Sequence, residues 1–167
     1  MKISLKLKEI SLNSVLRCLD VNNTKYKTKS NYIIIESKYI YIIFRPKNHQ
    51  ITHINVTKIP NLSEIDVAVN ILRKEIFPIL NISINQTNID NLTAVYNANK
   101  NIVLPEIIKH KKDYFKITYN NEKFPGMFVK FDVGTLIIFY TGKVIAVGCK
   151  TVNSLEYLFE ELNKFLK

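Results

Sequence analysis

The chain is poor in the residues that build flexible linkers, disulfide frameworks and membrane spans. Only 4 of its 167 residues are glycine, so most of the sequence is expected to be ordered. Its 2 cysteines, Cys18 and Cys149, lie far apart, which excludes a disulfide framework and a cysteine metal cluster. Residues 1–10 alternate apolar and charged side chains and lack the apolar region of a signal peptide. No apolar run approaches the length of a membrane span, so we expect an intracellular protein that no segment anchors in a membrane.

Acidic residues are outnumbered by basic ones. The chain has 24 Lys and Arg against 14 Asp and Glu, which gives a net charge of +10. This balance suits a polyanionic partner such as nucleic acid, or an anionic membrane surface. Many basic proteins bind neither, so the charge alone leaves these alternatives open.

Hydrophobic periodicity predicts the same order of elements twice. Runs of β-branched and aromatic residues predict strands, and apolar stripes at helical spacing predict helices. In the first half, the predicted elements are a helix at Ile10–Leu19, two strands within 31–45, a strand at Ile51–Thr57 and a helix from Asn61 to Pro78. In the second half, they are a helix at Val103–His110, strands at 125–131, 135–140 and Val144–Gly148, and a helix at Thr151–Leu166. Asn61 followed by Glu64 three residues later predicts a capping box.

Matching positions indicate that each half is one copy of a repeated unit. The matches are Ile42–Phe44 with Ile137–Phe139, Leu12 with Leu104, and Lys58 with Lys150. We therefore expect a first repeat, residues 1–78, and a second repeat, residues 79–167, which together form one structural domain. The predicted fold class is α+β, with a sheet that is covered by helices on one face and open on the other.

The segment from Tyr119 to Lys150 carries the most specific pattern. It contains, in order, Phe124-Pro125-Gly126, Phe139-Tyr140-Thr141-Gly142-Lys143 and Val147-Gly148-Cys149-Lys150. This series resembles the second repeat of the TATA-box-binding protein family, where Phe-Pro-Gly opens a strand, a Phe ends the next strand before Ser-Gly-Lys, and Thr-Gly-Ala-Lys precedes the long helix. The resemblance covers residues 85–167. It implies a two-repeat, pseudo-symmetric saddle with a curved antiparallel β-sheet and helices on the convex face.

The resemblance also implies a function, that of a transcription initiation factor which engages the minor groove of AT-rich double-stranded DNA and bends it. Asn91, in a segment similar to the family's first strand, would read the groove floor, and Phe124 and Phe139 would insert between base steps; this family is itself the standard example of that mechanism. The other residues to which we assign DNA contacts are Thr93, Phe44, Val144, Val147, Lys130, Lys143, Lys150, Lys29 and Arg45. A transcription factor B-like protein and RNA polymerase are the implied protein partners, with no cofactor and no small-molecule substrate.

The first repeat resembles the family less well. It keeps Phe44, but the repeat spacing places Lys29-Ser30-Asn31 where Phe-Pro-Gly is expected, and a lysine would contact phosphate instead of inserting between bases. The counterpart of Asn91 would fall before Met1, and Asn55 falls near the family's Thr position. We therefore expect the second repeat to kink DNA and the first mostly to hold phosphates. The sequence is also rich in Asn, Ile and Lys, which is typical of proteins from AT-rich genomes, and together with the divergent first repeat this indicates a viral source. The protein would act in the nucleus or cytoplasm, wherever transcription occurs, or in the host cytoplasm or virion if it is viral.

Two other classes of function stay open. The divergent first repeat favours a protein-interaction module of a transcription complex with weak or no specific DNA binding. An enzyme is disfavoured, because His49, His53 and His110 do not lie with Cys or carboxylates at metal-ligand spacing. The sequence also contains no Gly-rich phosphate loop and no nucleophile motif. It therefore predicts no catalytic residues and no metal site.

Overall fold

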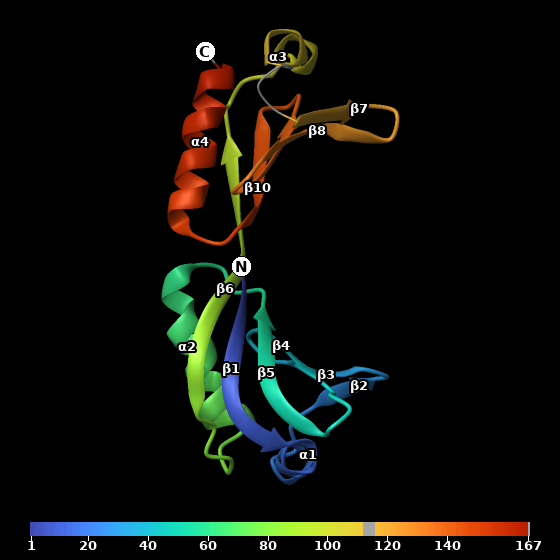
Figure 1. Ribbon diagram of the computed structural model, residues 1–167, viewed down its shortest axis with the longest axis vertical. Helices are drawn as coiled ribbons and strands as arrows, with labels where there is room; N and C mark the ends of the chain where they lie inside the picture. The colour runs from blue at the N-terminus through green and yellow to red at the C-terminus, as the bar shows by residue number, and fades with distance from the viewer. Residues whose placement is uncertain (112–115, 167) are drawn as a thin grey trace. The chain divides into compact units, whose positions relative to one another are not determined.

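A computed structural model describes residues 1–111 and 116–166 of the protein, apart from the side chains of residues 110, 111 and 165. The chain divides into two compact units, Met1–Asp90 (unit 1) and Asn91–Lys167 (unit 2). Strand β6 (Ile84–Asn97) begins in unit 1 and continues into unit 2 (Figure 1). The units are defined by packing and divide the chain after Asp90, whereas the expected boundary after residue 78 divides the two sequence repeats. The repeat boundary therefore stays a prediction.

Unit 1 is a β-sheet with helices over one face. Its strands are β1 (Lys2–Ser11), β2 (Tyr26–Lys29), β3 (Tyr32–Glu36), β4 (Ile40–Phe44), β5 (Gln50–Thr57) and the start of β6, in the order β2-β3-β4-β5-β1-β6. Its helices are α1 (Leu12–Val21) and a long helical segment made of η1 (Leu62–Glu64), α2 (Ile65–Ile71) and η2 (Leu72–Ile76). Alternate strand residues such as Ile33, Ile35 and Ile43 are buried in one core with both helical segments. The residues between them line the open face of the sheet.

Unit 2 repeats this arrangement. Its strands are the end of β6, β7 (Lys116–Asn120), β8 (Phe124–Phe131), β9 (Gly134–Phe139) and β10 (Lys143–Cys149), in the order β6-β10-β9-β8-β7. Its helices are α3 (Leu104–Lys111) and α4 (Val152–Leu166). Helix α4 packs against β9 and β10 (Figure 1). Leu158 and Leu162 on α4 are buried together with alternate strand residues such as Val129, Ile138 and Val144.

The structure confirms the α+β class and the order of elements in each repeat. The list of strands predicted from periodicity omits β1, β2, β6 and β7, and of these β2 and β7 lie at the two outer ends of the strand order. The residues of β2 and β7 are mostly exposed, so these two strands lack the apolar alternation that predicts a strand. Polar and charged residues are typical of edge strands, because they discourage pairing with other chains.

Two details of the predicted helices are wrong. Ile10 lies in β1, which ends at Ser11, instead of opening a helix, and α1 begins at Leu12. The capping box at Asn61 does not form, because its side chain makes no cap hydrogen bond to the helix. The Glu64 carboxylate, which would close the box, accepts hydrogen bonds from Lys38 and Tyr39 instead.

The strand ladders align the two repeats residue by residue. Ile54 lies opposite Ile43 in unit 1, as Val144 lies opposite Ile138 in unit 2, and Ile43 and Ile138 each precede a strand-end Phe. The corresponding positions are therefore Ile54 with Val144, Asn55 with Ile145, Thr57 with Val147, and Lys58 with Gly148. Lys58 and Gly148 support the alignment, since both have left-handed backbones with φ of 64° and 81°.

This alignment corrects two predicted matches. Lys58 corresponds to Gly148 and not to Lys150, so the shared feature at this point is a backbone conformation instead of a charge. Thr57, and not Asn55, takes the place of Val147 in the first repeat. The error arises because the β4–β5 turn is longer than the β9–β10 turn, so no single spacing aligns the whole repeat.

Candidate nucleic-acid interface

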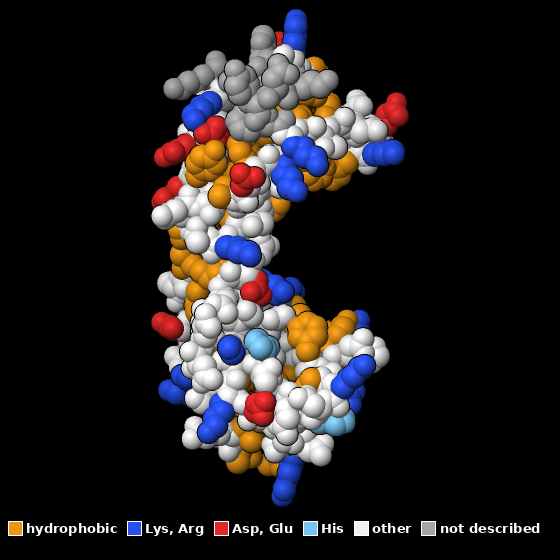
Figure 2. Space-filling view, in the orientation of Figure 1, with side chains coloured by type: hydrophobic (Ala, Val, Ile, Leu, Met, Phe, Trp, Pro, Cys, Tyr) orange, Lys and Arg blue, Asp and Glu red, His pale blue; other side chains and the backbone are white. Residues whose placement is uncertain are grey.

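Three phenylalanines form a cluster on the open face of unit 2. The ring centroid of Phe124 lies 5.2 Å from that of Phe128 and 5.8 Å from that of Phe139. Although it is large and apolar, Phe124 is 40% exposed. Figure 2 shows hydrophobic side chains gathered beside the β7–β8 hairpin, with Lys or Arg side chains next to them. Such a patch is a candidate binding surface.

Gly126 allows these rings to come together. It lies opposite Phe139 in the β8–β9 ladder, on the strand that carries Phe124 and Phe128. A Cβ atom at Gly126 would lie 2.6 Å from Cε1 of Phe124 and 3.1 Å from Cε1 of Phe139. The Phe-Pro-Gly motif thus has a structural reason, because the glycine leaves room for both rings. Sequence reasoning misses Phe128, although its two-residue alternation with Gly126 places it on the same face.

Asn91 is held on the same face by a backbone group. Its Oδ1 accepts a hydrogen bond from the N–H of Gly148 at 2.9 Å. Because a backbone N–H can only donate, the carbonyl end of the amide must face Gly148. The Nδ2 group is then the other end, 3.5 Å from Oγ1 of the exposed Thr93. The amide therefore offers a hydrogen-bond donor to a ligand on the open face.

Val144 is wrongly predicted as a contact residue. Its side chain is 0% exposed and lies in the helix-covered core. Because side chains alternate along β10, Ile145 and Val147 lie on the open face instead, and both are half-buried. Val95 lies opposite Ile145 on β6 and is 63% exposed. These apolar residues form the floor between Asn91 and the phenylalanine cluster.

The predicted lysines of unit 2 are exposed and have no ion-pair partner among the described residues. Lys130 lies opposite Lys116 on β7, and Lys143 lies opposite Asn97 on β6. Lys150 is exposed just before α4. Uncompensated charges of this kind can contact phosphates.

The open face of unit 1 carries an aromatic pair that the sequence pattern does not predict. Phe44 is 50% exposed, and its ring centroid lies 6.4 Å from that of Tyr32, directly opposite in the β3–β4 ladder. Tyr32 stands where unit 2 has Gly126, opposite Phe139. Lys29 does not replace the Phe of the motif, since it lies on β2 opposite Tyr32, with Nζ 5.9 Å from the ring centroid. Figure 2 shows hydrophobic and basic side chains together near β2–β4.

Arg45, the last residue assigned a contact, follows β4 directly and has an exposed side chain. Its N–H donates to the carbonyl of Asn31 at 2.9 Å, which holds the backbone of this segment beside β3.

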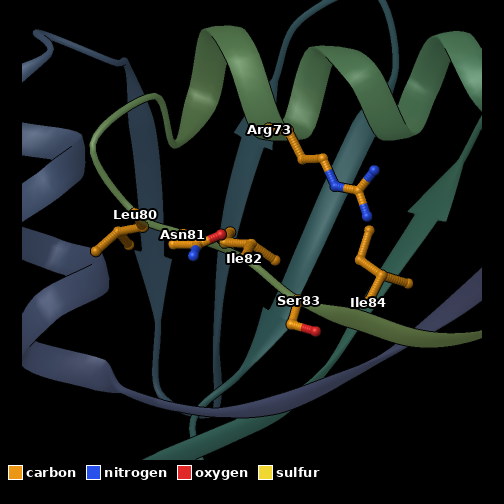
Figure 3. Close-up of a pocket in the computed structure, with 6 residues that line it drawn as sticks. All are labelled: Arg73, Leu80, Asn81, Ile82, Ser83 and Ile84. Carbon is orange, nitrogen blue, oxygen red and sulfur yellow. The ribbon is translucent and has the colours of Figure 1, made fainter.

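The described part of the surface contains several shallow hollows. One of about 430 Å³ is lined by Arg73, which extends from η2 toward Ile84, and by residues 80–84 (Figure 3). No group of three His, Cys, Asp or Glu among the described residues could hold a metal ion. His49 lies in a turn and His53 on a strand, both with exposed side chains, while the side chain of His110 lies outside the described residues. No helix in the described ranges could span a membrane.

Two repeats with this order of elements, each with an exposed aromatic cluster on its open face, define the class of TATA-box-binding-type folds. Residues 86–167 match the family described as "Transcription factor TFIID (or TATA-binding protein, TBP)". The solved structure of Methanococcus jannaschii TBP is similar to this chain with a TM-score of 0.78 at 19% sequence identity, over 98% of this chain and 93% of that one. No curated protein sequence gives a significant match. The resemblance to the TATA-box-binding protein family is thus confirmed, by the sequence of the second half and by the fold of the chain.

Proposed function

We propose that this protein is a DNA-binding transcription initiation factor that engages the minor groove with the open faces of its sheets and bends the DNA. One observation carries the proposal, namely that unit 2 presents an exposed phenylalanine cluster and the outward amide of Asn91 on the same open face. An AT-rich minor groove offers mainly hydrogen-bond acceptors, to which the amide can donate.

Phe124 and Phe139 would insert at a base step and kink the duplex. Unstacking costs a few kcal/mol per step, and contact between the apolar floor and the deformed groove offsets this cost. Lys130, Lys143 and Lys150 would hold phosphates. These contacts supply affinity but carry no sequence information.

Unit 1 would contact the groove differently. Tyr32 and Phe44 provide a second aromatic pair, and Lys29 and Arg45 provide charges for phosphates. By the same resemblance, the protein partners would be a transcription factor B-like protein and RNA polymerase. The site of action would be the nucleus or cytoplasm where transcription occurs, or the host cytoplasm or virion for a viral protein.

Energy transfer between the ends of a doubly labelled duplex tests the proposal. We expect wild-type protein to shorten the end-to-end distance of an AT-rich duplex more than that of a GC-rich one. The Phe124→Ala/Phe139→Ala variant should bind without bending. The matched control is Tyr157→Ala, which removes an aromatic side chain of similar exposure, 44%, from α4 on the other face.

The possible results separate the two candidate functions. Bending that disappears in the double variant and persists in the control supports insertion of the phenylalanines. Failure of the folded wild-type protein to bind either duplex contradicts DNA binding and favours the protein-interaction module. Salt must be held constant, because phosphate contacts make the affinity salt-dependent.

A further inference from the structure

The two units differ in polarity at a pair of facing residues on the open face. In unit 2, Val95 and Ile145 lie opposite each other and form an apolar floor. In unit 1, the register places Ser4 and Asn55 at the corresponding positions, also opposite each other. Their strand neighbours Leu5 and Ile54 are buried, so Ser4 and Asn55 point to the open face. The chain therefore carries a polar floor in one unit and an apolar floor in the other.

The amide of Asn55 is available to a ligand. Ser4 is already engaged, because its Oγ donates to Oδ1 of Asp90 at 2.9 Å. Within the described residues, the half-buried Asn55 side chain has no hydrogen-bond partner. The residue opposite it on β4 is Ile42, which offers no polar group. Asn55 thus presents both a donor and an acceptor on the open face of unit 1.

Guanine gives such an amide a specific partner. In the minor groove, A·T and T·A pairs show only acceptors, whereas a G·C pair adds the N2 amino group of guanine as a donor. An apolar side chain pressed against that amino group leaves the donor unsatisfied, which is costly once water is excluded. The Oδ1 atom of Asn55 can accept this hydrogen bond, and the Ile145 side chain cannot.

We propose that Asn55 is a specificity-determining residue that lets unit 1 accept a G·C pair in the minor groove, while Ile145 restricts unit 2 to A·T pairs. The proposal rests on the proposed function, because it requires that the open faces contact the groove floor. Its consequence is an asymmetric recognition site, in which one part tolerates guanine and the other does not.

A scan of single base-pair substitutions in an AT-rich duplex tests this inference. Each A·T pair is replaced in turn by G·C and by inosine·cytosine, which lacks only the N2 amino group, and affinities are measured by fluorescence anisotropy. We expect wild-type protein to tolerate G·C at one or more positions. At those positions, Asn55→Ile should weaken binding to G·C on the order of tenfold, the usual effect of one mismatched pair, and leave inosine·cytosine unchanged.

The reciprocal substitution in unit 2 provides a second test that does not depend on the Asn55→Ile variant. Ile145→Asn should gain tolerance for G·C at different positions, where wild-type protein rejects it. Circular dichroism must show that both variants are folded. The inference alone would be overturned if the ratio of the affinity for the G·C duplex to that for the inosine·cytosine duplex were the same for wild type and Asn55→Ile, while the parent duplex is still bound and bent. Absence of wild-type binding to the parent duplex would instead overturn the proposed function and, with it, the inference.

Discussion

The N–H of Gly148 donates to Oδ1 of Asn91 at 2.9 Å, and this bond fixes which end of the amide faces a ligand. Gly148 has a φ of 81°, a backbone conformation that L residues with side chains rarely adopt, and it lies at a register shift of the β6–β10 ladder. The backbone of one strand thus orients a polar side chain on its neighbour. The donor on the open face is a product of the fold and not of the asparagine alone.

Asn91→Asp should keep the fold and lose DNA affinity. The carboxylate can still accept from Gly148, but it cannot donate to base acceptors and it repels phosphates. We expect affinity for AT-rich DNA to fall by about tenfold or more, as for loss of a hydrogen bond to a base. Asn153→Asp on α4 is the control, because it makes the same charge change on the helix-covered side. Equal affinities for both variants, measured by anisotropy, would contradict this role of Asn91.

Gly126→Ala should impair bending more than binding. The new methyl group would lie 2.6 Å from Cε1 of Phe124 and 2.9 Å from Cγ2 of Ile137, so the Phe124 ring must move. Overpacking of this kind costs about 1–3 kcal/mol, which should lower Tm by several degrees. Thermal melting and energy transfer on the same sample would measure both effects. An unchanged bend angle would show that the position of Phe124 over Gly126 is unimportant.

Tyr32→Ala should reduce DNA bending if unit 1 also deforms the duplex. Tyr32 is half-buried beside the exposed Phe44, so Tyr32→Ala removes one of the two rings of this pair. Tyr32→Phe, which keeps the ring and removes only the hydroxyl, should bend DNA like wild type. Energy transfer would compare the two variants. If Tyr32→Ala bends DNA fully, then unit 2 alone produces the kink, as the sequence pattern predicts.

The exposed lysines should determine the salt dependence of binding. Removing one phosphate-binding charge reduces the steepness of log affinity against log salt by about 0.9. Lys130→Gln and Lys143→Gln should each reduce the slope in this way. The control is Lys74→Gln, which should leave the slope unchanged because the exposed Lys74 lies on η2 in the helical segment. Titrations at several salt concentrations would give the slopes. A similar decrease for all three variants would mean a diffuse charge effect instead of specific contacts.

Unit 1 should lose stability at acidic pH through Glu64. Hydrogen bonds from Lys38 and Tyr39 lower the pKa of the Glu64 carboxyl below its ordinary value. A lowered pKa in the folded state contributes stability above the unfolded pKa, and this contribution is lost as the pH falls through the folded pKa. The free energy of unfolding of Glu64→Gln should therefore depend less on pH in the acidic range. It should differ less from that of wild type at low pH than at neutral pH. Urea unfolding between neutral and strongly acidic pH would measure it, and parallel curves for both proteins would contradict the assignment.

The fold class and the main features of unit 2 can be predicted from the amino-acid sequence. Alternation in β8, β9 and β10 predicts strands, because it depends on local spacing. The resemblance of the Phe-Pro-Gly and Phe-to-Gly-Lys motifs to the family's second repeat locates Phe124 and Phe139. The matching starts of α1 and α3 at Leu12 and Leu104 are likewise visible in the repeat. Local periodicity reports which residues share a face within one element.

Which residues of different strands meet depends on tertiary pairing and cannot be predicted from local patterns. A single repeat spacing misplaces Lys29 and hides Tyr32, because the turns of the two repeats differ in length and register is set by pairing across strands. The pattern also assigns Val144 to the wrong face, since the face depends on where the ladder begins. The orientation of the Asn91 amide and the correspondence of Asn55 with Ile145 are likewise decided by pairing between strands, because both depend on which backbone groups lie opposite each other.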